Sequence, residues 1–349
     1  MLFLGDLSIP NAECGQKLVL DMKRCGVFEK QVVVVNLEGV LHQNNPQDIF
    51  WKVYNDSSAM DLQTVCKQLV FGLANNHLYD YPEKIQPMLE ILRENKIPYF
   101  GMRCANGDIL PLEIQEHGVE YAIFGHCWEV YTKTNRNEKT DDRIADCSYS
   151  EFYQMVVQYI NKHPSKKVIC YLHWNFDLEE LPFPAHKKLA HDLIDYGVEA
   201  VIGNHAHCEQ EVEMYHGKVI AYGLGNFYMP DGYFFDGTLR YSEKSHRTMG
   251  IQLSPEGVLV HEFETDFGGD ALKLTSTSVC DQSEKTFRME ESYDEKAYEK
   301  VFRKERKKRK LTPIFYTYEN SLGTRFKTTL CIWKIHAIRF VKQLRDKRR

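Results

Sequence analysis

Short apolar runs alternate with amphipathic segments over most of the chain. The runs lack the alternation of polar and apolar residues that a solvent-facing strand shows, and several of them are rich in valine or isoleucine. Runs of this kind are typical of strands that are buried on both faces of a sheet. We expect such strands at 1–5, 31–40, 69–74, 98–101, 119–125, 167–172, 200–202 and 218–227.

The segments between the runs place apolar residues at helical spacing. We expect helices at 12–25, 58–67, 83–95, 151–161 and 185–196. Strands that alternate with helices predict an α/β fold. Beyond residue 248 the pattern changes to shorter strands at 248–254, 257–265 and 271–278, which we interpret as a terminal β-layer. The polar and charged segment 131–147 is expected to be an exposed loop or insertion.

Polar side chains follow five of the apolar runs directly. They are Asp6, Glu38, Asn76, His77, His173, His205 and His207. Residues i and i+2 of an extended segment point to the same side, so His205 and His207 can face one point. Each residue also has a structural interpretation: Asp6 as a cap, Asn76 in a left-handed turn, or a histidine that packs in a loop. One sheet edge, however, would bring all five ends together.

Two carboxylates, an amide oxygen and four imidazoles form a mixed set of nitrogen and oxygen donors. Such a set suits Zn, Mn or Fe better than Ca or Mg, which prefer oxygen alone. Seven donors exceed the three protein ligands of a usual catalytic zinc site. The sequence therefore predicts a site for two divalent metal ions (Mn, Fe or Zn) that share a carboxylate.

The cysteines and the N-terminal residues indicate the cellular compartment of the protein. Ten cysteines are scattered along the chain with no C-x-x-C pair, and the first residues lack the basic and apolar regions of a signal peptide. No apolar stretch approaches the length of a transmembrane helix. We expect reduced cysteines and a cytoplasmic protein.

Six motifs in this order resemble one family. The motifs 5-GD-6, 36-NLEG-39, 74-ANNHLYD-80, 173-HW-174, 203-GNHAH-207 and 217-GKVIAYGLGNF-227 are similar to those of the CapA family of capsule-biosynthesis proteins. That family, also called the poly-gamma-glutamate capsule proteins, belongs to the calcineurin-like metallophosphoesterase superfamily. The resemblance implies an αββα sandwich in residues 1–280, followed by a basic C-terminal extension in 281–349.

The resemblance also implies roles for the site residues. Asp6 and His207 would bind the first metal, Glu38 would bridge, and Asn76, His173 and His205 would bind the second. His77 would protonate the leaving group or stabilise the charge of the transition state, and Asp80 would orient His77.

This chain departs from the family pattern at several positions. Ser8 stands where the superfamily has a histidine, which would leave the first metal poor in ligands. Asn175 replaces a glycine, and we expect either Glu179 or Glu180 to supply an acidic group that the family has nearby. Cys208 is interpreted as a small buried residue rather than a ligand.

Two functions remain open from the sequence. The first is a metal-dependent hydrolase that cleaves phosphate esters in a phosphorylated or polymer-linked substrate during synthesis of a capsule or surface polymer. The second is a non-catalytic accessory protein that binds metal or polymer within a synthesis complex at the membrane surface.

The C-terminal segment differs in charge from the rest of the chain. Residues 301–349 contain 16 Lys and Arg against 3 Asp and Glu, a net charge of +13, whereas residues 1–300 carry −18. In 325–349 an apolar stripe recurs at helical spacing: Phe326, Leu330, Trp333, Ala337, Val341 and Leu344. The helix could lie on an anionic membrane, which would place the protein at the inner face of the membrane, or dock on the body of the protein. The basic run 303–310 has no recognition motif beside it, so we do not expect nucleic acid as a partner.

Overall fold

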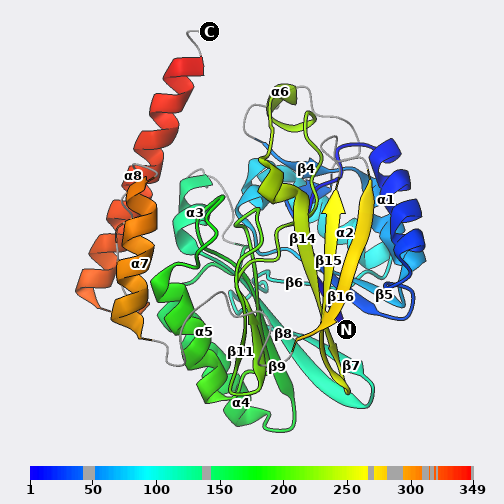
Figure 1. The fold of residues 1–349 in the computed structure, drawn as a ribbon, viewed down its shortest axis with the longest axis horizontal. Coiled ribbons are helices and arrows are strands. Elements are labelled where there is room, and N and C mark those ends of the chain that lie inside the picture. The colour runs from blue at the N-terminus through cyan, green and yellow to red at the C-terminus, as the bar shows by residue number, and fades with distance from the viewer. Residues whose placement is uncertain are drawn as a thin grey trace.

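The computed structural model describes residues 1–41, 52–135, 143–265, 271–280, 294–308, 314, 318–319 and 321–346 (Figure 1). In this part of the chain two β-sheets pack face to face, and helices cover their outer faces. The expected α/β fold and the αββα sandwich are therefore confirmed.

The first sheet is mixed. Its strands are β1 (Leu2–Leu7), β2 (Val32–Leu37), β5 (Gln68–Gly72), β6 (Tyr99–Phe100), β13 (Asn226–Tyr228), β14 (Arg247–Ser254), β15 (Gly257–Thr265) and β16 (Leu272–Val279). They lie in the order β16-β15-β14-β1-β2-β5-β6, and β13 pairs with β1 outside this path. β1, β2, β5 and β6 run parallel, whereas β14, β15 and β16 form the antiparallel layer expected at the end of the sequence.

The second sheet has a parallel centre with antiparallel edges. It consists of β7 (Leu112–Glu116), β8 (Val119–Cys127), β9 (Lys167–His173), β10 (Ala200–Asn204), β11 (Val212–Tyr215) and β12 (Lys218–Ala221), in the order β11-β12-β10-β9-β8-β7. A separate two-stranded pair joins β3 (Val40–Leu41) to β4 (Tyr54–Asn55).

Three apolar layers hold the sandwich together. Phe3, Val34, Val70, Ile169 and Ile202 belong to the layer between the sheets. The outer face of the first sheet packs against α1 (Ala12–Cys25), α2 (Ile85–Glu94) and the 3₁₀ helix η1 (Ser57–Val65). The outer face of the second sheet packs against α4 (Tyr149–Lys162) and α5 (Pro184–Tyr196). Burial of both faces explains why the central strands read as unbroken apolar runs.

Local signals fix the ends of the helices. The Asn11 side chain accepts a hydrogen bond from the Cys14 amide at the start of α1, and Gly26 ends that helix in a left-handed conformation. Ser148 and Glu151 form a capping box at the start of α4. The remaining helices are α3 (Glu129–Asn135), α6 (Phe234–Gly237), α7 (Glu295–Lys308), α8 (Leu322–Asp346) and the 3₁₀ helices η2 (Asn76–Asp80), η3 (Pro82–Lys84) and η4 (Glu243–His246).

The ends of the parallel strands meet because two glycines allow the chains to approach closely. A Cβ atom at Gly5 would lie 1.9 Å from the carbonyl oxygen of Gly225, and one at Gly203 would lie 2.0 Å from that of Tyr222. Gly5 directly precedes Asp6, and Gly203 stands two residues before His205. Any side chain there would push the strand away from its neighbour and misplace the residue that follows.

The helix expected at 58–67 is a 3₁₀ helix over Ser57–Val65. One sequence-based expectation is corrected by the structure. The segment 131–147 is not an exposed loop throughout, because α3 extends to Asn135 and residues 144–146 are buried. Residues 136–142 of that segment lie outside the described residues. The apolar residues Val130, Tyr131, Ile144 and Ala145 explain this burial, since they pack inward between the charged positions.

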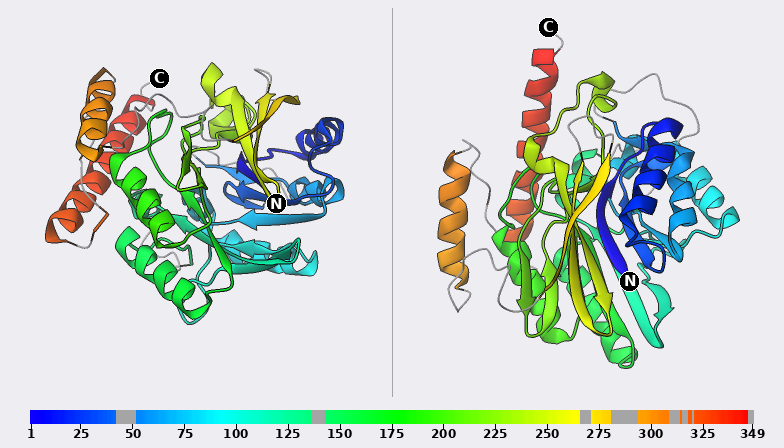
Figure 2. Two further views of the ribbon diagram at one scale, coloured as in Figure 1. Left: turned by 60° about the horizontal axis from the view of Figure 1, so that its bottom comes forward. Right: turned by 45° about the vertical axis from the view of Figure 1, so that its right-hand side comes forward.

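The C-terminal helices lie against the second half of the sandwich (Figure 1, Figure 2). α7 packs on α5, and α8 packs on α3. The proposed domain boundary at residue 280 stays a prediction, and residues 281–293 lie outside the described part. Among the described residues, no helix has the length and apolar content needed to cross a bilayer.

Candidate metal centre

Predicted site residues gather where parallel strands of both sheets end. Asp6 lies in β1, Glu38 directly follows β2, and His173 is the last residue of β9. One ligand atom from each of these three buried side chains lies within 4.8 Å of the others. An Asp/Glu/His group able to hold a metal ion is thus buried between the two sheets.

The Nε2 atom of His173 is the centre of a tight group of donors. It lies 2.9 Å from Oδ1 of Asn76, 2.9 Å from Nδ1 of His205 and 3.6 Å from Oε1 of Glu38. Asn76 opens the 3₁₀ helix η2 after β5, and His205 follows β10 with a φ of 84°. The unusual backbone of His205 turns its imidazole back toward the end of β9.

A second group of contacts surrounds Asp6. Its Oδ2 atom accepts a hydrogen bond from the backbone amide of His205 at 3.1 Å and lies 3.4 Å from Nδ1 of His207. The same Nδ1 atom lies 2.8 Å from Oδ1 of Asn226 on β13, which fixes the orientation of the ring. Asp6 thus belongs to the first sheet and contacts two histidines that follow β10 of the second sheet.

Asn36 links the two carboxylates. Its Nδ2 atom donates to Oδ1 of Asp6 at 2.7 Å and to Oε2 of Glu38 at 2.5 Å. Sequence reasoning did not place Asn36 or Asn226 in the site. The signal for Asn36 was its position one residue before Leu37-Glu38, inside a motif already noted. Its side chain neutralises part of the repulsion between two buried acids.

His77 and Asp80 lie at the less buried edge of the strand-end pocket, the site formed by Asp6, Glu38, Asn76, His173, His205 and His207. Nδ1 of His77 is 2.7 Å from Oδ2 of Asp80, and the same carboxylate oxygen accepts the backbone amide of Val53 at 2.8 Å. The other ring nitrogen, Nε2, lies 3.9 Å from Oε1 of Glu38. The pair has the geometry in which Asp80 orients His77, and the catalytic role of both stays a prediction.

Burial dominates the electrostatics of the pocket. It raises the pKa of Glu38 well above its usual value, and the neighbouring Asp6 charge adds to this shift. Burial also lowers the pKa of His173 well below its usual value, with His205 contributing, and lowers the pKa of His207. For His173 and His207 these shifts favour the neutral form, which is the form that binds metal ions.

The Ser8 hydroxyl is engaged elsewhere. It donates to the carbonyl oxygen of Tyr54 on β4 at 2.8 Å. Cys208 is buried, as interpreted from the sequence, and its Sγ atom lies 3.5 Å from the carbonyl oxygen of Glu179. All ten cysteines are free of disulfides.

The acidic residue beside the pocket is Asp177. Its Oδ1 atom lies 2.8 Å from Nε2 of His205. The two glutamates expected here point elsewhere, because Glu179 pairs with Arg306 and Glu180 with Lys244. Positive φ angles at Asn175 and Leu178 set the course of this loop, and the sequence alone did not reveal them.

Helix α7 holds the loop that carries Asp177. Nη1 of Arg306 donates to Oε2 of Glu179 at 2.7 Å, and both side chains are buried. The hydroxyl of Tyr298 donates to the carbonyl oxygen of Pro182 at 2.7 Å, and Phe302 packs on Phe183. The C-terminal extension thus contributes to the shape of the site's rim.

The donor set fits a divalent ion. Oε1 of Glu38 is buried and has no hydrogen-bond partner among the described residues. Donors that bind a common ion at about 2.1 Å stand about 3.0–3.4 Å from each other, close to the separations around Nε2 of His173. A cation there would satisfy the carboxylate oxygen and separate the crowded imidazoles.

Comparison with known proteins gives a consistent result. A family model described as "Bacterial capsule synthesis protein PGA_cap" matches residues 21–231. The chain is 26% identical to the capsule biosynthesis protein CapA of Bacillus anthracis over 172 residues, which cover 47% of this chain and 41% of that protein. It is also 26% identical to the PGA biosynthesis protein CapA of Bacillus subtilis over 201 residues, 55% of this chain and 51% of that protein.

The match spans about half of the length of these two relatives. Among solved structures, a 5'-nucleotidase precursor from Thermus thermophilus is similar with a TM-score of 0.41 and 13% sequence identity. That similarity covers 80% of this chain and 53% of the nucleotidase.

Proposed function

Because the chain belongs to the bacterial capsule synthesis protein family, we propose that it is a metal-dependent hydrolase that serves the synthesis of a surface polymer. One observation carries the proposal. The unpartnered Oε1 atom of Glu38 faces both the donors around His173 and the Nε2 atom of His77. Ion-binding groups and a group able to transfer a proton thus meet at one point.

Different side chains have different roles in the proposed reaction. A divalent ion held by Glu38, Asn76, His173 and His205 would supply Lewis acidity and activate a water. Asp80 accepts the Nδ1 proton of His77, which leaves Nε2 directed into the pocket. In the imidazolium form, with a second proton on Nε2, His77 would donate that proton to the leaving oxygen and return to the neutral ring. The substrate class we propose is a phosphate ester, in a phosphorylated or polymer-linked molecule.

We propose two ions of unequal affinity. The position around Nε2 of His173 has two imidazoles, an amide oxygen and a carboxylate oxygen. The position beside Asp6 has His207 and the shared Glu38, but Ser8 supplies no ligand and Asn36 already binds both carboxylates. The position around Nε2 of His173 would fill at lower metal concentration than the position beside Asp6, with Mn, Fe or Zn.

A second candidate function is a non-catalytic accessory protein that binds metal or polymer. The hydrogen bond of the Ser8 hydroxyl to Tyr54 favours it, because it leaves the position beside Asp6 without this ligand, and hydrolysis of a phosphate ester by two metals needs both ions in place. The His77–Asp80 pair favours the hydrolase, since an accessory protein has no use for an oriented proton donor.

The test measures metal binding and turnover on the same preparation. Titration calorimetry with Mn²⁺ would give the stoichiometry, and p-nitrophenyl phosphate and bis-p-nitrophenyl phosphate would report hydrolysis. The hydrolase predicts turnover that His77→Ala lowers by about 10²–10⁴-fold while Mn²⁺ binding persists. His117→Ala, in an exposed turn, is the matched control. Bound Mn²⁺ without turnover on either ester supports an accessory protein that binds metal. Absence of binding contradicts both the hydrolase and a metal-binding accessory protein, and leaves only the polymer-binding form of the second function.

A further inference from the structure

Helix α8 has two faces with different surroundings. Cys331 is buried, and Ile332 and Ile335 pack against the apolar layer of the second sheet. On the other face Phe326, Leu330 and Trp333 are 65%, 38% and 71% exposed. The helix therefore docks on the body, and at the same time the apolar stripe noted in the sequence faces water.

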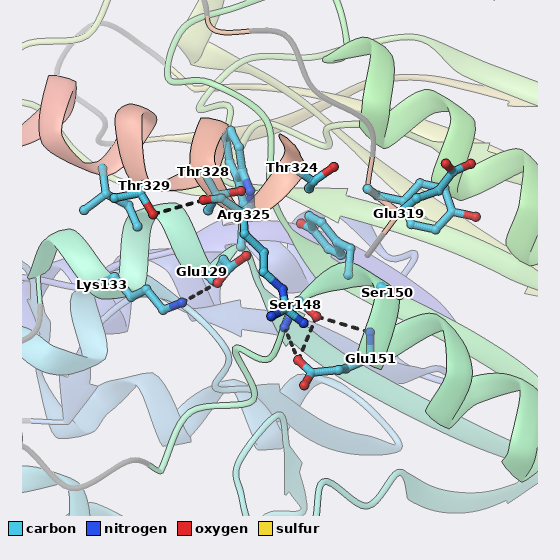
Figure 3. A pocket seen from close by; sticks show the side chains of 14 residues that line it. Glu129, Lys133, Ser148, Ser150, Glu151, Glu319, Thr324, Arg325, Thr328 and Thr329 are labelled. Atoms are coloured by element: carbon cyan, nitrogen blue, oxygen red, sulfur yellow. Dashed lines mark hydrogen bonds and ion pairs between the residues drawn. The ribbon is translucent and has the colours of Figure 1, made fainter. Parts of the chain in front are cut away.

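The docked side of α8 is the more polar one near its start. A cavity of about 440 Å³ lies between α8 and the starts of α3 and α4 (Figure 3). From α8 it is lined by Thr324, Arg325, Thr328, Thr329 and Ile332. Hydroxyls and charged groups thus face inward here, whereas aromatic side chains face outward. Docking on the body accordingly does not explain the stripe.

The exposed stripe continues along a helix that leaves the body. Phe326, Leu330, Trp333 and Ala337 recur at the spacing of one helix face. The backbone remains helical to Asp346, and the C-terminal half of α8 projects beyond the sandwich (Figure 1, Figure 2). The same spacing in the sequence reaches Val341 and Leu344, whose side chains lie outside the described residues.

Basic residues surround this stripe. Lys327 is exposed next to Phe326, whereas Arg325 lines the cavity on the docked side. Residues 325–349 contain nine Lys and Arg and one Asp. A surface that combines aromatic side chains with a strong positive charge matches the interface of an anionic bilayer, where aromatic rings and basic groups both find partners.

We propose that the outer face of α8 binds the surface of an anionic lipid bilayer, with Phe326, Leu330 and Trp333 inserted between headgroups. A second copy of this chain is a poorer occupant, because it would bring two strongly basic helices together. Nucleic acid would neutralise the charge and leave the aliphatic part of the stripe in water. The proposal does not depend on catalysis or on bound metal.

The experiment uses the full-length chain and two kinds of vesicle. Co-sedimentation is measured with phosphatidylcholine vesicles and with vesicles that also contain phosphatidylglycerol. We expect binding to the anionic vesicles, weakened by added salt. Phe326→Glu/Trp333→Glu is expected to reduce partitioning by on the order of a hundredfold. Lys327→Gln is expected to weaken binding by roughly fivefold.

The controls separate lipid binding from misfolding and from other partners. Leu20 is an exposed leucine on α1, so Leu20→Glu should leave vesicle binding unchanged. Circular dichroism and thermal melts confirm that each variant is folded. In a Trp51→Phe background, emission should shift to the blue on anionic vesicles, because Trp128 and Trp174 are buried and Trp333 is exposed.

Three results would overturn the proposal. One is equal sedimentation of the wild type and Phe326→Glu/Trp333→Glu with anionic vesicles. A second is self-association in light scattering that Trp333→Glu abolishes, with no vesicle binding, which would assign the stripe to a second copy. A third is retention of duplex or single-stranded nucleic acid in place of vesicles.

Discussion

The strand-end pocket and helix α8 depart from the usual distribution of polar and apolar groups in opposite directions. The pocket buries carboxylates and imidazoles that would normally be solvated, and α8 exposes aromatic side chains that would normally be buried. Each departure costs free energy in the isolated chain. The difference supports the two different partners proposed above, a cation inside and a lipid surface outside.

The contact between α7 and the loop beside the metal centre gives the largest expected effect. Arg306 on α7 pairs with Glu179 in the loop that carries Asp177, and both side chains are buried. We expect Arg306→Ala to lower the free energy of unfolding by about 3–5 kcal/mol, because it leaves the Glu179 carboxylate buried without its cation. Urea titrations would measure this loss.

Its controls use the same helix and the same pair. Arg303 on α7 is largely exposed, so Arg303→Ala should change stability by less than about 1 kcal/mol. The double variant Arg306→Ala/Glu179→Gln should recover part of the loss, since no charge is then left buried. If Arg306→Ala were as stable as the wild type, α7 would not hold the loop.

A substitution at Glu38 should affect metal binding and the stability of the fold in different ways. We expect Glu38→Gln to weaken Mn²⁺ binding roughly hundredfold, about 2.7 kcal/mol, because the amide keeps the shape and loses the charge. In the presence of a chelator the same variant should be as stable as the wild type or more so, since burial disfavours the carboxylate and raises its pKa.

Calorimetry with Mn²⁺ and melting with EDTA measure these two quantities. Glu120→Gln, at an exposed position of β8, is the matched control and should leave both unchanged. A Glu38→Gln variant that melts early in EDTA would mean that the carboxylate stabilises the fold without an ion.

His126 provides a buried imidazole outside the pocket. It lies 2.7 Å from the carbonyl oxygen of Cys147, and burial lowers its pKa to about 4. Since its unfolded pKa is about 6.5, the unfolded chain binds more protons between these values, and stability falls as the pH falls from 6.5 toward 4.

This histidine should contribute about 2 kcal/mol to the loss of stability between pH 7 and pH 5. We expect His126→Gln to show a correspondingly smaller loss over that interval, and His216→Gln, at an exposed turn, to show the wild-type loss. Equal pH dependence in the wild type and His126→Gln would contradict the assignment. Urea titrations at the two pH values provide the measurement.

The smallest expected effect concerns two neighbouring residues of α8, one on its outer face and one on its docked face. Leu330→Asp, on the outer face, should change the free energy of unfolding by no more than about 0.5 kcal/mol. Cys331→Asp places a carboxylate against the apolar layer and should cost several-fold more. Similar losses for both variants would mean that α8 is docked through the stripe itself.

The sequence predicted the part of the site that depends on local pattern. Apolar runs that end at Asp6, Glu38, His173 and His205 indicated strands whose carboxyl ends meet, and the structure brings these residues together. Asn226 escaped prediction because it reaches the site only through the pairing of β13 with β1, which joins residues far apart in the chain. Asp177 escaped because its position depends on positive φ angles at Asn175 and Leu178.

The docking of α8 shows another limit of the pattern. The stripe at Phe326, Leu330 and Trp333 correctly indicated one apolar face, and the two alternatives considered were contact with the body or contact with a membrane. The structure docks the helix through Cys331, Ile332 and Ile335 and leaves the stripe exposed. The docked side of α8 combines polar and apolar residues without a helical period. Its contact with the body of the protein could therefore not be predicted from residue spacing.

The donors of the metal centre come from both halves of the sandwich. Asp6, Glu38 and Asn76 belong to the first sheet and its connections, whereas His173, His205 and His207 belong to the second. A cation bound among them would cross-link the two sheets at the edge where the strands end. Removing it with a chelator would then weaken the whole contact between the two sheets and not only the metal site.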